Sequence, residues 1–291
     1  MGTVWELDFY SRPLLDENNK KRWEVLLCEG LVGTGIDADG LFRYSKFLSS
    51  SEVNSITLKG AIEEAIAEAN RQGIAPPSRI RYFRYQMQNM ILRACEEAGV
   101  PARPSRRTVA LQRWLSDRTQ TLYPTMEGYT SAPSPSVAAP PPSPQALPDA
   151  LLGQQWSFVT LEAAAFADLP DWEIGFGESF PLDMANLEPN TPIPGLLIFS
   201  PRATALAAWM SGLELAHWRI ESSKTPQIIL ETGAADSWVL AGLPGSDLLA
   251  EAQAFEAAKA KANQVHFIGI QDKSDSESFA GFWLLQELNL G

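Results

Sequence analysis

The chain has 291 residues, 45% hydrophobic and 20% charged, which is the composition of an ordinary globular protein. Two Cys and two His are too few for a disulfide framework, a zinc site or a His-based catalytic triad, and no run of apolar residues is long enough to span a membrane. The first residues resemble neither a signal peptide nor a transit segment. We therefore expect a protein of the reducing cytoplasm that needs no cofactor.

The charge is unevenly distributed along the chain. Residues 1–123 hold 17 basic and 15 acidic side chains, a net charge of +2, whereas residues 124–291 hold 6 and 20, a net charge of −14. The second half should repel polyanions, so any contact with phosphate is expected in the first half.

The first 123 residues predict a domain with the element order β-hairpin, β, α, β, α, short β, α. This succession matches ribonuclease H-like domains, which is an analogy of fold and not of function. The expected segments are strands 5–10, 23–28 and 42–48, a helix from 55 to 73, a strand over 79–85, a helix ending at Gly99, a short strand over 103–107 and a helix that Thr108 caps.

Ribonuclease H-like domains that cleave RNA hold two metal ions with carboxylates on the first strand, the first helix and the end of the fourth strand. Here Asp8 lies on the first expected strand and Glu63 or Glu64 on the first helix, but the fourth strand ends in Tyr85-Gln86. Two-metal chemistry needs several converging anionic oxygens. Neutral side chains at this place favour a site that binds without cutting and holds no metal.

Arginine is concentrated in the stretch 79–118, which contains nine Arg, no Lys and only three acids. Arg grips phosphate with a planar fork and stacks on bases, and aromatic residues alternate with Arg over 79–85, as in surfaces that bind single-stranded nucleic acid. A buried strand followed by helices with solvated Arg is the other interpretation. Because neighbouring strand residues face opposite ways, Arg81 and Tyr82 cannot both line one surface.

A proline-rich linker is expected over 124–150, and a second, acidic domain with a mixed sheet and helices over 151–291. Residues 131–150 contain seven Pro among Ser and Ala. The acidic loop 168–194 carries spaced aromatic residues, which suit either a protein-binding lip or a belt around the domain. The second domain contains no recognisable catalytic constellation.

Four segments together resemble the Tab/Atab-type family of cyanobacteria and chloroplasts. They are Trp5–Pro13, Lys21–Cys28, Tyr82–Met87 and Gly281–Leu285. The resemblance implies an RNA-binding activator of translation of photosystem reaction-centre mRNAs, chiefly those of photosystem I, and here a cyanobacterial, cytoplasmic member.

The leading hypothesis is a protein that binds a single-stranded mRNA leader. Tyr82 or Tyr85 would stack on bases. In the family a C-terminal Trp-Leu-Leu is tied to RNA binding, and it corresponds to Trp283, Leu284 and Leu285, which would either touch RNA or only support the fold. The residues expected to contact phosphates are Arg79, Arg81, Arg84, Arg103, Arg106 and Arg107.

Two further hypotheses belong to other classes. The acidic second domain could hold a basic protein partner, which would make the chain an assembly factor. A nuclease would use Asp8, Glu24 and Glu63 or Glu64 to hold Mg²⁺.

Overall fold

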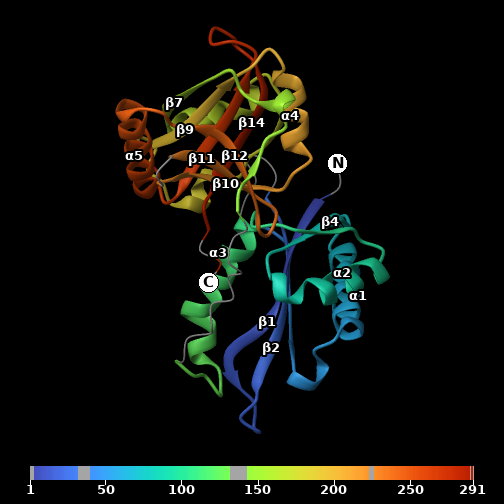
Figure 1. Ribbon diagram of the computed structural model, residues 1–291. Helices are drawn as coiled ribbons and strands as arrows, with labels where there is room; N and C mark the ends of the chain where they lie inside the picture. The colour runs from blue at the N-terminus through green and yellow to red at the C-terminus, as the bar shows by residue number, and fades with distance from the viewer. Residues whose placement is uncertain (1–2, 32–39, 132–142, 223–225, 289, 291) are drawn as a thin grey trace. The chain divides into compact units, whose positions relative to one another are not determined.

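A computed structural model of the chain describes residues 3–31, 40–131, 143–222, 226–288 and 290 (Figure 1). These residues form two compact units, one that contains residues up to 131 together with residue 290, and one over residues 143–288. Each unit combines mixed sheets with helices, so the expected α/β class is confirmed. Among the described residues, no helix is both long and apolar enough to cross a membrane.

The first unit is built on one five-stranded sheet with the order β3-β2-β1-β4-β5. β2 pairs antiparallel with β1 and β3, whereas β1 and β4, and β4 and β5, pair in parallel, so β2 alone runs against the other strands. The elements are β1 (Thr3–Leu15), β2 (Lys21–Glu29), β3 (Arg43–Leu48), α1 (Ser55–Arg71), β4 (Pro77–Tyr82), α2 (Gln88–Glu97), β5 (Ala102–Pro104) and α3 (Val109–Asp117).

The two faces of this sheet differ in chemistry. Trp5, Leu7 and Phe9 alternate along β1 and are buried in a core with α1 and α2. Glu6 and Asp8 point to the other face, where Glu6 Oε2 accepts a hydrogen bond of 2.7 Å from the backbone N–H of Leu111 in α3. In Figure 1, α1 and α2 accordingly lie on one side of β1 and β2 and α3 on the other.

The strand predicted over 79–85 is shorter than expected. β4 ends at Tyr82, and a turn of 3₁₀ helix, Tyr85–Met87, leads into α2. Arg84 and Tyr85 therefore lie beyond the strand, where its strict alternation no longer governs which way they point.

Both ends of the predicted linker belong to folded structure. The backbone N–H of Leu15 donates to the carbonyl of Gly128 at 2.8 Å, and that of Thr130 donates to Pro13 at 2.9 Å. At the other end β6 (Gln145–Ala146) pairs in parallel with β12. The linker over 124–150 stays a prediction, and the residues from 132 to 142 lie outside the described ones.

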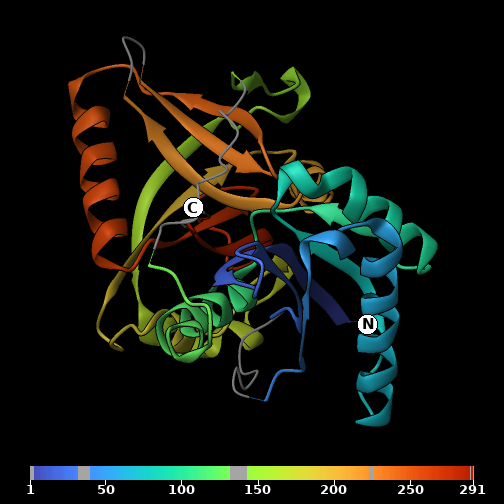
Figure 2. The same ribbon diagram turned by 90° about the horizontal axis from the view of Figure 1, so that it is seen from below.

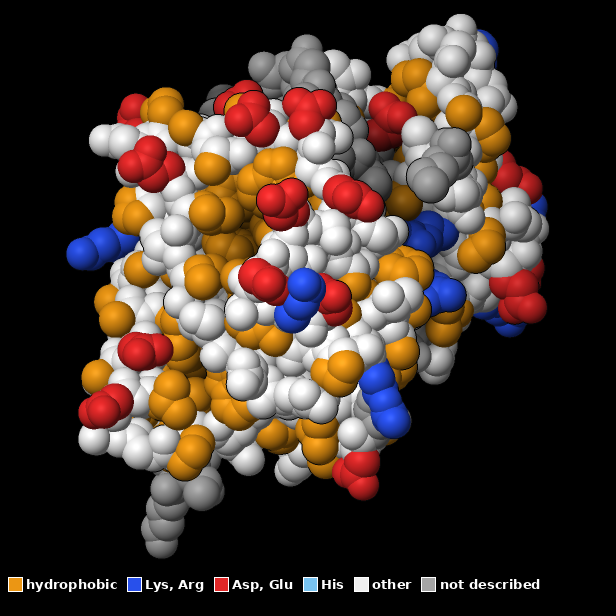
Figure 3. Space-filling view, turned by 90° about the horizontal axis from the view of Figure 1, so that it is seen from above, with side chains coloured by type: hydrophobic (Ala, Val, Ile, Leu, Met, Phe, Trp, Pro, Cys, Tyr) orange, Lys and Arg blue, Asp and Glu red, His pale blue; other side chains and the backbone are white. Residues whose placement is uncertain are grey.

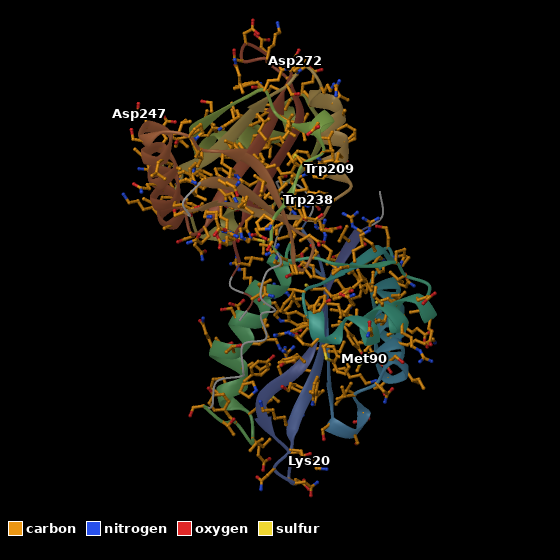
Figure 4. The ribbon with its side chains drawn as sticks, in the orientation of Figure 1. Lys20, Met90, Trp209, Trp238, Asp247 and Asp272 are labelled. Atoms are coloured by element: carbon orange, nitrogen blue, oxygen red, sulfur yellow. The ribbon has the colours of Figure 1, made fainter. Side chains whose placement is uncertain are left out.

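The second unit contains a four-stranded sheet, β10-β11-β12-β6, and a five-stranded sheet, β7-β9-β13-β14-β8. Trp209 of α4 meets Trp238 of β12 edge-on, with ring centroids 5.1 Å apart (Figure 4). α5 runs beside the strands in Figure 2. The main helices and strands of the second unit after β6 are β7 (Gln155–Glu162), β8 (Ile174–Glu178), β9 (Pro192–Phe199), α4 (Ala203–Ser211), β10 (Leu215–Glu221), β11 (Gln227–Thr232), β12 (Asp236–Gly242), α5 (Ser246–Lys261), β13 (Val265–Gln271) and β14 (Phe279–Gln286).

The acidic loop predicted as irregular over 168–194 contains a strand. Residues 174–178 form β8, which pairs in parallel with β14. Trp172, just before β8, stacks on Phe279 with ring centroids 5.8 Å apart, and Phe180 is buried. Phe176 packs against the core of the same unit, so all three spaced aromatic residues pack onto their own unit, which favours the belt over the protein-binding lip.

Candidate functional site

A buried carboxylate on β1 is held by two arginines. Asp8 is fully buried, and its Oδ2 accepts a hydrogen bond from Arg12 Nη1 at 2.8 Å while its Oδ1 accepts one from Arg84 Nε at 2.9 Å. Burial alone would raise the pKa of Asp8, but the charges and hydrogen bonds of Arg12 and Arg84 outweigh it and hold the pKa below its ordinary value. Asp8 is therefore a paired anion with both oxygens engaged.

A second buried carboxylate, Glu24 on β2, extends this network. Glu24 Oε2 accepts from Arg12 Nε at 2.9 Å and from the Tyr123 hydroxyl at 2.6 Å, and Glu24 Oε1 accepts from Arg118 Nη2. Burial raises the pKa of Tyr123, and Glu24 adds to this effect while Arg12 opposes it. The Tyr123 hydroxyl therefore stays protonated and donates its hydrogen bond. Two carboxylates and three guanidinium groups leave the network one positive charge in excess.

The loop after β4 is fixed to the sheet by Arg84. Besides its ion pair with Asp8, the Arg84 guanidinium lies 4.2 Å from the ring centroid of Tyr10 and 4.5 Å from that of Phe83. Tyr85, the next residue, is 52% exposed. The anchored Arg84 thus holds an aromatic ring at the surface, where it could stack on a base.

Four of the residues predicted to contact RNA are buried. The exposed fractions are 2% for Arg81, 7% for Arg84 and 5% for Arg107, and Tyr82 is fully enclosed in the core beside Leu7. Arg84 is turned inward by its partner Asp8. The expected open arginine surface therefore does not include these four side chains, and for Arg84 the ion pair with Asp8 accounts for the burial.

The other predicted contacts in the first unit keep exposed surface. Tyr85 and Arg103 are exposed, and Arg79 and Arg106 are partly buried. Arg103 on β5 stands in register with Arg81 on β4, so the two share a face of the sheet. The sheet therefore brings a guanidinium from β5 to the same face as those of β4.

Comparisons with known proteins match nearly all of the chain. The family model described as "RNA-binding protein Tab2/Atab2 N terminal" matches residues 4–118, and that described as "RNA-binding protein Tab2/Atab2, C-terminal domain" matches residues 134–286. The chain belongs to the Tab2/Atab2 family.

Two plant relatives are similar in alignments of 290 positions that cover 98% of this chain. "Protein TAB2 homolog, chloroplastic" of Arabidopsis thaliana is 39% identical over 74% of its own length, and the protein of the same name from Zea mays is 36% identical over 71%. No solved structure gives a significant match. The resemblance drawn from the sequence motifs is confirmed.

The Trp-Leu-Leu segment that the resemblance ties to RNA binding in the Tab2/Atab2 family lies inside the second unit. Trp283, Leu284 and Leu285 are in β14, between β13 and β8, and all three side chains are buried. Their position makes them part of the core of the sheet.

Sequence reasoning missed the two residues that organise the buried network. Arg12 and Tyr123 connect Asp8 with Glu24, yet neither was singled out. Arg12 stands four residues after Asp8 inside the opening motif. An acidic and a basic residue this close on one strand could have indicated an ion pair. Tyr123 gave no such signal, because its partner Glu24 is 99 residues away.

The second unit has a buried lysine that pairs with two partly exposed glutamates. Lys259 is buried, and its Nζ lies 2.7 Å from Glu287 Oε2 and 3.2 Å from Glu256 Oε2. Nearby, His266 Nε2 accepts a hydrogen bond of 3.1 Å from the backbone N–H of Trp218. Burial and the positive charge of Lys259 hold the pKa of His266 well below 6.5, so the imidazole is neutral. Within the described residues, no group of three or more His, Cys, Asp or Glu could hold a metal ion.

Proposed function

We propose that this protein binds single-stranded RNA without cleaving it, and that it acts in translation or biogenesis of photosystem reaction-centre subunits, chiefly those of photosystem I. The observation that carries the proposal is the match of both halves of the chain to family models described as RNA-binding. The two similar plant proteins are named as chloroplastic, which supports a role in photosynthetic cells. The cytoplasmic location stays a prediction.

The RNA contacts are proposed for the exposed part of the arginine-rich stretch. Tyr85 would stack on a base, and Arg79, Arg103 and Arg106 would contact phosphates. The supporting residues would act indirectly by fixing the sheet and the loop that carry these contacts. They are Arg81, Tyr82, Arg84 and Arg107 in the first unit and Trp283, Leu284 and Leu285 in the second.

Binding without cleavage is supported by the partners of the carboxylates. We infer a ribonuclease H-like arrangement for the first unit, on the strand order β3-β2-β1-β4-β5 with β2 alone reversed. In such a domain a nuclease needs an acid at the end of the fourth strand, but here Arg84 follows that strand and pairs with Asp8. The other acids of the nuclease hypothesis are also paired: Glu24 with Arg12 and Arg118, Glu63 with Lys59 and Glu64 with Lys46.

A salt titration of binding tests this proposal. The equilibrium constant for a labelled single-stranded RNA should fall with salt at a logarithmic slope of about −0.7 for each phosphate neutralised, or about −3 for four contacts. The same RNA, incubated with the protein and Mg²⁺, should stay intact. A flat salt dependence, or cleavage that Asp8→Asn abolishes, would contradict the proposal.

A basic protein partner is proposed for the second unit in addition to RNA. Its half of the chain carries a net charge of −14, and the face turned to the viewer in Figure 3 shows more Asp and Glu side chains than Lys and Arg side chains. Complementary charge would steer a basic partner to such a surface. Co-purification of such a protein after ribonuclease treatment is the expected result, and its loss on that treatment would count against a direct protein contact.

A further inference from the structure

Arginine and aromatic side chains alternate over a second surface of the first unit. The Arg22 guanidinium lies 4.5 Å from the ring centroid of Phe47, and Arg118 lies 6.0 Å from the same ring. Arg118 also lies 5.3 Å from the ring of Trp114, which Arg43 approaches to 5.8 Å. We call these five residues, Arg22, Arg43, Phe47, Trp114 and Arg118, the arginine–aromatic strip.

The register of the sheet explains why these residues meet. Phe47 on β3 stands opposite Glu24, and Arg43 stands opposite Cys28, so both side chains point to the face of the sheet that α3 covers. Trp114 comes from α3 itself, and Arg118 follows the end of that helix. Because β3 is an edge strand, the strip lies along the border of the sheet.

The strip combines exposure with positive charge. Arg43 is exposed and Arg22 and Phe47 are partly buried, whereas Trp114 is buried and Arg118 is committed to Glu24. In the part of the chain that the structure describes, none of the ion pairs involves Arg22, whose contact is the ring of Phe47. The charge of Glu24 is already offset by Arg12 and Arg118. Arg22 therefore adds positive charge that Glu24 does not cancel.

We propose that the arginine–aromatic strip is a second contact surface for single-stranded RNA. The inference rests on the proposed RNA-binding function and adds a site to it. The Arg22 guanidinium, which lies on the Phe47 ring, keeps its N–H edge for a phosphate and its outer face for a base. Because the rings already hold the guanidinium groups in place, less side-chain freedom is lost when RNA binds.

A hollow at one end of the strip limits where the RNA can lie. Arg22 also lines a space of about 470 Å³ whose other charged residues are Asp16, Glu17 and Glu127. Three carboxylates would repel a phosphate, so we place the RNA along β3, from Arg22 towards Arg43.

The test compares two double variants that lose the same charge. Arg22→Gln/Arg43→Gln removes two guanidinium groups from the strip. Arg71→Gln/Arg93→Gln removes two from α1 and α2, where both side chains are largely exposed and paired on the helices that cover the opposite face. Each protein is titrated with a labelled single-stranded RNA of mixed sequence over a range of salt concentrations, and its thermal unfolding midpoint is recorded.

The strip variant should bind more weakly and show a logarithmic salt slope smaller in magnitude by about 1.4, which corresponds to two lost phosphate contacts. The control variant should keep the wild-type slope. If the wild type binds steeply and both variants keep its slope, the strip is not a contact surface, and the proposed RNA-binding function stands. If the wild type fails to bind RNA, both proposals fall together.

A second measurement covers the case in which the strip variant unfolds. The wild-type protein is crosslinked to RNA that contains 4-thiouridine, and the crosslinked peptides are identified. Crosslinks within residues 43–48 would support the strip, and their absence alongside crosslinks elsewhere in the first unit would overturn it.

Discussion

Arg84 and Asp8 are 76 residues apart in the chain, yet Arg84 Nε donates to Asp8 Oδ1 at 2.9 Å and both side chains are buried. The pair ties the loop after β4 to the middle of β1. The carboxylate that a nuclease would need for a metal ion is here paired with a guanidinium. The contact thus positions Tyr85 and occupies one of the two Asp8 oxygens that would otherwise coordinate a cation, and Arg12 occupies the other.

Asp8→Asn should destabilise the protein by about 3–5 kcal/mol, because it leaves Arg12 and Arg84 buried without their counter-charge. Urea unfolding at pH 7 measures the change in the free energy of unfolding. The lowered pKa of Asp8 means that its contribution is present above the pKa of the unfolded chain and is lost as the pH falls through the folded value. The variant should therefore lose less stability in acid than the wild type, and equal stability of the two at pH 7 would contradict this account.

Tyr85→Ala should weaken RNA binding by about 1–3 kcal/mol, the usual contribution of one stacked base. The free energy of unfolding should change by less than about 0.5 kcal/mol, because the side chain is half exposed. Fluorescence anisotropy and urea unfolding measure the two quantities. Tyr85→Trp, which keeps a stacking ring, should bind like the wild type. Unchanged binding by the Ala variant would remove Tyr85 from the interface.

Trp283→Ala should cost about 3–5 kcal/mol of stability, because it leaves a cavity in the core of the second unit. Trp283→Phe keeps most of the apolar contact and should stay folded. We expect the folded Phe variant to bind RNA with wild-type affinity, since the indole is buried. A folded Phe variant that has lost RNA binding would show that Trp283 contacts the RNA directly.

His266 should make stability depend on pH below 6.5. In the unfolded chain the imidazole takes up a proton as the pH falls through 6.5, whereas in the folded chain its lowered pKa keeps it neutral, so acid favours unfolding. The wild type should lose about 1.4 kcal/mol for each pH unit from this group alone, until the folded pKa is reached. Urea unfolding at pH 7, 6 and 5 should show a smaller loss for His266→Gln, and parallel curves would contradict it.

The elements that could be predicted from the sequence are those with local signals. Trp5, Leu7 and Phe9 alternate with polar residues, and Asn54 caps α1 through a hydrogen bond of 2.9 Å from the backbone N–H of Thr57. These patterns involve residues close together in the chain. They predict a strand or a helix without any knowledge of how the rest of the chain packs.

The candidate site depended on distant residues and was only partly predictable. The arginine-rich stretch was apparent, but the burial of Arg84 depends on Asp8, and that of Arg118 on Glu24, 94 residues away. The sequence likewise gave no sign that Arg22 and Phe47 meet, because the register of β2 against β3 brings them together. The buried or exposed state of an arginine thus followed from tertiary pairing, which composition does not record.

Crosslinking of the intact protein to cellular RNA, with mapping of the crosslinked peptides, tests the central claim most directly. We predict crosslinked peptides from the first unit, above all those containing Tyr85, Arg103 or the arginine–aromatic strip, with RNA that remains uncut. Crosslinks confined to residues 143–288, or no crosslink to RNA, would contradict the account.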